Sequence, residues 1–95
     1  MTSFCKELSK TERKWNFIYI PSKYRELFPK GKSFKVYLKG ESFEVSLNKA
    51  GRIVRKDLVK KLGRIERCVI TVVKKSENEF RIDVLDEDIR KIVAP

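Results

Sequence analysis

The charged and reactive side chains of this sequence are mostly lysines and arginines, and many of them lie in one segment. The chain of 95 residues carries 23 lysines and arginines against 13 acidic residues, a formal net charge of +10. The basic segment, residues 49–67, holds eight of these cations, namely Lys49, Arg52, Arg55, Lys56, Lys60, Lys61, Arg64 and Arg67. Ammonium and guanidinium groups are the groups that bind phosphates, so these eight residues are the candidate nucleic-acid contacts.

The charges are unevenly distributed along the chain. Asp57 and Glu66 are the only acids of the basic segment, whereas six acids face three cations between Glu77 and Lys91. A stretch with a net charge of +6 thus precedes one with −3. Such an asymmetry orients the electrostatic field and attracts polyanions to one face. A solvated basic surface that binds nothing is the alternative interpretation.

Catalytic and metal-binding chemistry finds little support in the residue types. The chain has no histidine and lacks the GxGxxG, P-loop and GxSxG patterns. Cys5 and Cys68 have no metal-ligand spacing, so we expect reduced, buried thiols, with a disulfide between them left open. The three acids at 86–88 suit the start of a helix better than a metal ion, because adjacent helical residues point in different directions. We expect a non-enzymatic protein without cofactor or metal.

The elements expected to carry the cations come in two similar halves. The pairs at an offset of 34 are Ile20 with Val54, Tyr24 with Leu58, Phe28 with Leu62, Phe34 with Cys68, Val36 with Ile70 and Leu38 with Val72. The pairs at an offset of 37 are Phe43 with Phe80, Val45 with Ile82 and Leu47 with Val84. The three added residues fall in a hairpin loop, where insertions are tolerated. The ordered match indicates a duplicated unit, residues 16–47 and 51–84.

Each unit predicts a strand, a short helix and a hairpin. Residues 16–20 predict a strand that Pro21 ends, followed by a helix capped near Ser22 with Tyr24, Leu27 and Phe28 on its apolar stripe. The second unit has a strand at 51–54 and a helix that buries Val54, Leu58 and Leu62. Alternating apolar residues predict two half-buried strands in each hairpin. Whether residues 4–8 add a further strand stays open, and a C-terminal helix at 86–93 completes the prediction.

Six short amphipathic strands favour closure, because closure removes exposed edges. We therefore expect one mainly β domain, residues 1–95, folded as a six-stranded, pseudo-two-fold closed barrel with short helices. The stretches IYIPSKYREL (18–27) and GRIVRKDLVKKLG (51–63) resemble the GRIVIPKELREKLG core of AbrB-like swapped-hairpin regulators. Two units in one chain resemble the RIFT type of cradle-loop barrel, and the resemblance implies an archaeal member.

The resemblance implies a nucleic-acid partner, with DNA favoured over RNA. The alternative is a ribonucleoprotein or protein-interaction module of the translation-factor barrel type, and a lesser one is nucleotide binding as in the related riboflavin kinase. Trp15-Asn16-Phe17 replaces the usual Gly-Arg, which moves any basic contact there to Arg13 and Lys14. Arg55 replaces the proline of the second copy, and both departures argue against a two-fold symmetric DNA contact.

The aromatic residues Trp15, Phe17 and Tyr19 have two interpretations. They can stack on bases, but aromatics on a strand of so small a barrel are expected in the core. The segment Met1–Lys14 lacks the apolar stretch of a secretion signal, and no apolar run is long enough to span a membrane. We expect a cytoplasmic monomer.

Overall fold

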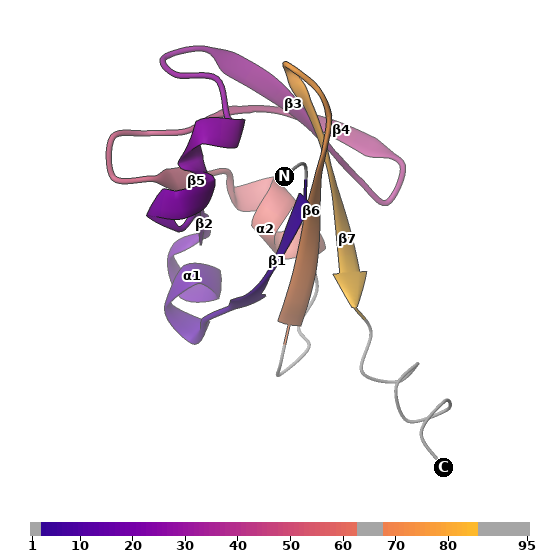
Figure 1. The fold of residues 1–95 in the computed structure, drawn as a ribbon. Coiled ribbons are helices and arrows are strands. Elements are labelled where there is room, and N and C mark those ends of the chain that lie inside the picture. Colours follow the sequence, from indigo (N-terminus) through magenta and orange to yellow (C-terminus); the bar gives the residue numbers. More distant parts are fainter. Residues whose placement is uncertain (1–2, 63–67, 86–95) are drawn as a thin grey trace.

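The computed structural model describes residues 3–62 and 68–85, in which seven strands, two α-helices and one 3₁₀ helix form (Figure 1). In chain order these are β1 (Ser3–Leu8), α1 (Lys10–Trp15), β2 (Phe17–Tyr19), the 3₁₀ helix η1 (Ser22–Leu27), β3 (Ser33–Leu38), β4 (Glu41–Ser46), β5 (Arg52–Val54), α2 (Lys56–Lys61), β6 (Cys68–Ser76) and β7 (Glu79–Leu85). The chain is a mainly β domain with short helices. The helix predicted at 86–93 lies outside the described residues.

The order strand, helix, hairpin recurs in the two halves of the chain. The helices η1 and α2 begin at Ser22 and Lys56, which are separated by the predicted offset of 34, and each is followed by an antiparallel hairpin. The first hairpin turns through Lys39 and Gly40, both with positive φ. The helix of the first unit is 3₁₀ rather than α, and its N-cap is Pro21, which makes no side-chain capping bond, rather than Ser22. The same order of elements supports the duplication, which stays a prediction.

The strands form two sheets. Five strands pair in the order β1-β6-β7-β3-β4, and β2 pairs with β5 in a separate antiparallel ladder. All neighbours in the larger sheet are antiparallel except β3 and β7, which run parallel. In Figure 1, α1, α2 and the β2–β5 pair lie together on one side of the long β6–β7 hairpin.

The strands do not close into the six-stranded barrel predicted from the sequence; among residues 3–62 and 68–85, no sheet closes. If the two units were related by a two-fold axis, β3 would correspond to β6 and β7 to β4. The counterpart of the observed β3–β7 pair would then be a pair between β6 and β4. That edge of β6 is occupied by β1, which pairs antiparallel along it from Ser3 opposite Val73 to Leu8 opposite Cys68. The strand at 4–8 that the sequence left open thus forms, and it blocks the pairing that closure would need. A single bridge, Leu47 to Ile53, extends the β4 segment toward β5.

The core confirms the predicted alternation in both hairpins. Phe28 stacks on Phe80 with ring centroids 4.3 Å apart, and Phe4 of β1 stacks on Tyr24 at 4.3 Å. Leu58 and Leu62 of the second unit are fully buried, as predicted. The buried hairpin positions are Phe34, Val36, Leu38, Phe43, Val45, Cys68, Ile70, Val72, Phe80 and Ile82.

Val54 and Cys5, both predicted to be buried, are exposed instead. Val54 is 60% exposed, because β5 alternates so that Ile53, opposite Ile18 of β2, points into the core. Cys5 is exposed and Cys68 is buried. Cys5 on β1 and Cys68 on β6 lie three residue pairs apart along the ladder, and side chains an odd number of pairs apart point to opposite faces of the sheet. Both cysteines are free.

Candidate nucleic-acid interface

Helix α1 was not predicted, and it brings a second group of cations to the surface. Ser9 caps it in a reciprocal capping box: Ser9 Oγ accepts from Glu12 N at 3.1 Å, and Glu12 Oε1 accepts from Ser9 N at 3.0 Å. Asn16 ends the helix in the left-handed conformation, with φ of 59°. Lys10, Arg13 and Lys14 follow at i, i+3 and i+4, so they share one face.

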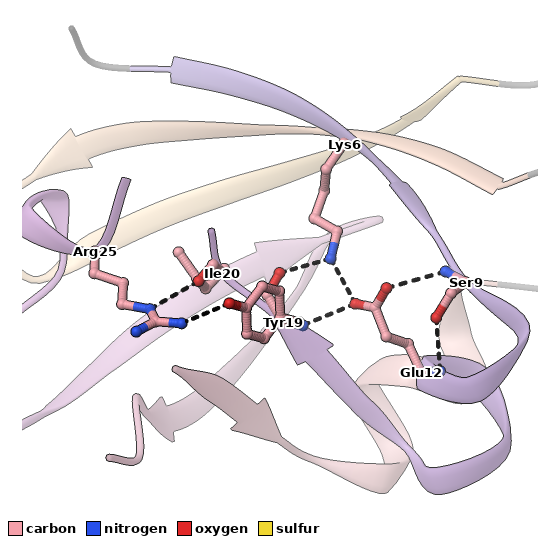
Figure 2. Close-up of polar contacts among 6 residues, drawn as sticks. All are labelled: Lys6, Ser9, Glu12, Tyr19, Ile20 and Arg25. Carbon is pink, nitrogen blue, oxygen red and sulfur yellow. Dashed lines mark hydrogen bonds and ion pairs between the residues drawn. The ribbon is translucent and has the colours of Figure 1, made fainter. Parts of the chain in front are cut away.

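A buried carboxylate anchors α1 to the sheets (Figure 2). Glu12 is 6% exposed, and its Oε2 accepts from Lys6 Nζ of β1 at 2.6 Å and from the backbone N of Tyr19 in β2 at 2.8 Å. Lys6 also donates to the Tyr19 carbonyl oxygen at 2.6 Å. Because one side chain holds groups from β1, α1 and β2, the position of α1 depends on this ion pair.

The same network reaches η1 and the start of β5. Arg25 of η1 donates from Nε to the Ile20 carbonyl oxygen at 2.9 Å and from a terminal nitrogen to the Tyr19 hydroxyl at 2.9 Å (Figure 2). Gly51 lies under this guanidinium with φ of 77°, and a Cβ there would overlap the Arg25 side chain. The Gly51 carbonyl accepts from Ile20 N at 2.8 Å, so the glycine permits the close approach of the two units.

Helix α2 presents the remaining cations of the site. Leu58 and Val59 are buried, which orients the short helix and leaves Lys56 and Lys60, at i and i+4, exposed on its outer side. Lys56 and Lys60 face the cations of α1 across a hollow of about 710 Å³. We call this the basic hollow; its described lining is Lys10, Arg13, Lys14, Asn16, Lys56, Val59 and Lys60.

The charge of the basic hollow is of one sign. Five of its lining residues are cations, and none of the described lining residues is acidic. Like charges gathered around one concave surface repel each other and raise the local positive potential, and a bound polyanion relieves that repulsion. The described lining of the hollow therefore attracts anions.

The predicted contacts within the described residues do not all line one hollow. Lys56 and Lys60 line the basic hollow, whereas Arg52 and Arg55 line a separate hollow of about 470 Å³ that also contains Glu44. Arg55 donates to both carboxylate oxygens of Asp57, at 2.6 and 3.1 Å, and to the Glu44 carbonyl oxygen. These hydrogen bonds raise the pKa of Arg55 and lower that of Asp57. The Arg55 guanidinium is thus already held by protein acceptors.

The other predicted cations lie elsewhere. Lys61 forms an ion pair with Glu41, and its carbonyl accepts from Lys39. Lys49 is exposed in the turn before β5 and lines none of the hollows described here. Arg64 and Arg67 lie outside the described residues. The predicted contacts therefore lie at different places on the surface, and only Lys56 and Lys60 line the same hollow as the three cations of α1.

Sequence reasoning missed α1, although the signal was present. Ser9-Lys10-Thr11-Glu12 has the S-x-x-E pattern of a capping box, and three cations follow at helical spacing. The expectation that a basic contact shifts to Arg13 and Lys14 did name two of the three. For the aromatic residues, the core expectation is confirmed for Phe17 and wrong for Trp15 and Tyr19, which are 63% and 40% exposed.

The arrangement is that of a small β domain with a basic hollow between two short helices. No family model, curated protein or solved structure matches the chain. None of the helices within the described ranges is long and apolar enough to cross a membrane.

Proposed function

We propose that this protein binds the phosphate backbone of nucleic acid through the basic hollow, without a catalytic role. The observation that carries the proposal is the convergence of Lys10, Arg13, Lys14, Lys56 and Lys60 around one hollow. A single small anion would neutralise only part of this charge. A polymer with phosphates at regular spacing can contact several of the cations at once, and each contact releases condensed counterions.

The proposal also draws on the net charge of +10, which favours association with any extended polyanion. DNA is the first ligand to test, and RNA of the same sequence is the second. Phosphate contacts position a nucleic acid without reading its bases, so we expect similar affinities for unrelated sequences. Non-specific binding of this kind has dissociation constants of about 10⁻⁴–10⁻⁶ M at physiological salt, so titrations should start at low ionic strength.

We further propose that the fold derives from the duplicated unit of the cradle-loop barrels. The support is the shared order of strand, helix and hairpin at the offset of 34, together with the antiparallel pairing of the equivalent strands β2 and β5. In this proposal β1 was added at the edge of β6 and opened the barrel. Pairing of β4 with β6 in place of β1, measured by NMR contacts between the strands, would contradict this part of the proposal.

The experiment measures the affinity for labelled duplex DNA at a series of salt concentrations, with fluorescence anisotropy as the binding signal. Phosphate contacts by the four exposed lysines of the basic hollow, Lys10, Lys14, Lys56 and Lys60, predict a slope of log affinity against log salt of about −3.6, since each contributes about −0.9. The double variant Lys14→Gln/Lys60→Gln should reduce the magnitude of that slope by about 1.8. Both side chains are exposed, so the folded state should be little affected.

The matched control removes the same charge from another part of the surface. Lys35→Gln/Lys75→Gln replaces two exposed lysines on β3 and β6 that do not line the basic hollow. Lys74 is unsuitable as a control because it donates to the Leu27 carbonyl oxygen at 2.7 Å and so contributes to the fold. Equal changes in slope for the two double variants, or a wild-type slope near −1, would refute the assignment of the site.

A further inference from the structure

The large apolar side chains exposed on the described surface are few, and two of them share one hollow. Trp15, the last residue of α1, is 63% exposed, and Val54 of β5 is 60% exposed. Both line a hollow of about 460 Å³, which we call the Trp15 hollow, together with Thr11, Phe17, Asn48 and Arg52. An exposed tryptophan beside a second apolar side chain is a feature that folding alone does not require.

The Trp15 hollow offers flat surfaces of the kind that bind planar rings. The Arg52 guanidinium carbon lies 4.5 Å from the centroid of the buried Phe17 ring, so the phenyl ring holds the guanidinium in place. The Trp15 indole is the second flat surface of the same hollow. Aromatic rings and guanidinium planes are the groups on which proteins stack nucleobases.

Trp15 is next to the basic hollow. The Lys14 ammonium, which belongs to the basic hollow, lies 5.4 Å from the centroid of the Trp15 ring. Along α1, Lys10, Arg13 and Lys14 face one hollow, and Thr11 and Trp15 face the other. One short helix therefore places a cationic group and an aromatic ring side by side, which matches the arrangement of phosphate and base within one nucleotide.

We propose that the Trp15 hollow takes an unpaired base of a strand whose phosphates lie in the basic hollow, so that the preferred ligand is single-stranded nucleic acid. This inference rests on the proposed function. In a duplex the bases are paired and stacked inside, and their faces are closed to Trp15. In a single strand every base presents a face, and stacking then tolerates any sequence. The phosphates supply the salt-dependent part of the affinity and the base supplies the preference for single strands.

Tryptophan fluorescence reports on this contact directly, because Trp15 is the only tryptophan of the chain. The probes are a single-stranded oligothymidylate, a duplex of equal length, and heparin as a polyanion without bases. We expect the single strand to quench the fluorescence, with a midpoint equal to that of binding measured by anisotropy. The duplex and heparin should bind at low salt and quench much less. Equal quenching by heparin would overturn the stacking of a base.

Substitution of Trp15 separates this inference from the proposed function. Trp15→Ala should weaken single-strand binding about 5- to 150-fold, the range that corresponds to one stacked base, and leave duplex binding unchanged. Trp15→Phe keeps an aromatic face and should restore part of the affinity. Leu85→Ala is the control, since Leu85 is 41% exposed on β7 and outside the hollow. Thermal unfolding of each variant verifies the fold.

Three results would count against the proposals in different ways. Single-strand binding without quenching, and unchanged in Trp15→Ala, would overturn the stacking role of Trp15 and leave phosphate binding in place. Loss of duplex binding in Trp15→Ala, equal to the loss of single-strand binding, would overturn the preference for unpaired bases. Failure of both nucleic acids to bind at low salt would overturn the proposed function itself.

Discussion

Replacing Glu12 by alanine tests whether the buried carboxylate holds α1 against the sheets. The substitution removes the acceptor of Lys6 Nζ, which is 2.6 Å away, and of the backbone N–H groups of Ser9 and Tyr19, at 3.0 and 2.8 Å. Only 10% of the Lys6 side chain and 7% of the Glu12 side chain are exposed. Water therefore cannot fully replace the lost carboxylate without a rearrangement of the surrounding chain.

The expected loss in the free energy of unfolding follows from the Lys6 charge that Glu12→Ala leaves in the buried site. Removing one partner of a buried ion pair costs about 3–5 kcal/mol, because the remaining charge stays buried, and the Tyr19 carbonyl oxygen that Lys6 still contacts compensates only part of it. The Ser9 hydroxyl still caps the backbone N of residue 12, so the capping box loses only its Glu12 half, and this loss overlaps with that of the ion pair in one side chain. We expect a total loss of about 3–5 kcal/mol. For a domain of this size, that is a fall in Tm of at least about 12 °C.

The assay is urea unfolding monitored by circular dichroism. The control is Glu26→Ala, since Glu26 is an exposed glutamate on η1. The control should change stability by less than about 0.5 kcal/mol. The double variant Lys6→Met/Glu12→Leu should recover part of the loss, because no unpaired charge remains. A loss below about 1 kcal/mol in Glu12→Ala, or no recovery in the double variant, would refute the reasoning.

Three further expectations follow from the core and the surface. Leu58→Ala should destabilise the protein by about 2–4 kcal/mol in urea unfolding, because Leu58 is fully buried; a loss under about 1 kcal/mol would contradict this packing. A disulfide reagent should label Cys5 at once and Cys68 only on unfolding, since burial shields the Cys68 thiol and raises its pKa; equal rates would contradict it. Tyr37→Phe removes the hydroxyl that donates to Glu79 at 2.8 Å, a bond that raises the pKa of Tyr37 and lowers that of Glu79. Its stabilisation is present between about pH 4.5 and 10, and is lost as the pH falls through the lowered pKa of Glu79 or rises through the raised pKa of Tyr37. The variant should therefore show a flatter dependence of Tm on pH at both ends, and an unchanged pH profile would contradict the bond.

Local spacing in the sequence was enough to assign which residues of each hairpin face the core. Alternation has a period of two in a strand, so the phase of Phe34, Val36 and Leu38 could be assigned from their spacing alone. The recurrence of the pattern also located the two helices, η1 and α2, at the offset of 34. The net charge was likewise a property of composition. These features could be predicted because each depends on residues that are close together in the chain.

The positions of single residues near element boundaries were less well determined. Val54 matched Ile20 at the common offset, yet β5 places Ile53 inward and Val54 outward. A shift of one residue reverses every side chain of a strand, and a strand as short as β5 contains too little pattern to determine its phase. Pairing with β2, a partner distant in the sequence, decided it.

The sequence alone did not determine which strand edges pair or which cations line one hollow, because both depend on the complete fold. Periodicity shows which face of a strand is apolar, but it does not show which strand pairs with which. Either β1 or β4 could have paired with the free edge of β6, and the relative stability of these two pairings depends on the whole fold. The Glu12 network holds the N-terminal segment in place, and α1 thereby lies across from α2. Lys14 and Lys60 are far apart in sequence and line one hollow, whereas Arg55, close to Lys60 in sequence, is held by Asp57. Charge is encoded residue by residue, but a site requires convergence in space, and the long-range packing of α1 and α2 supplies it.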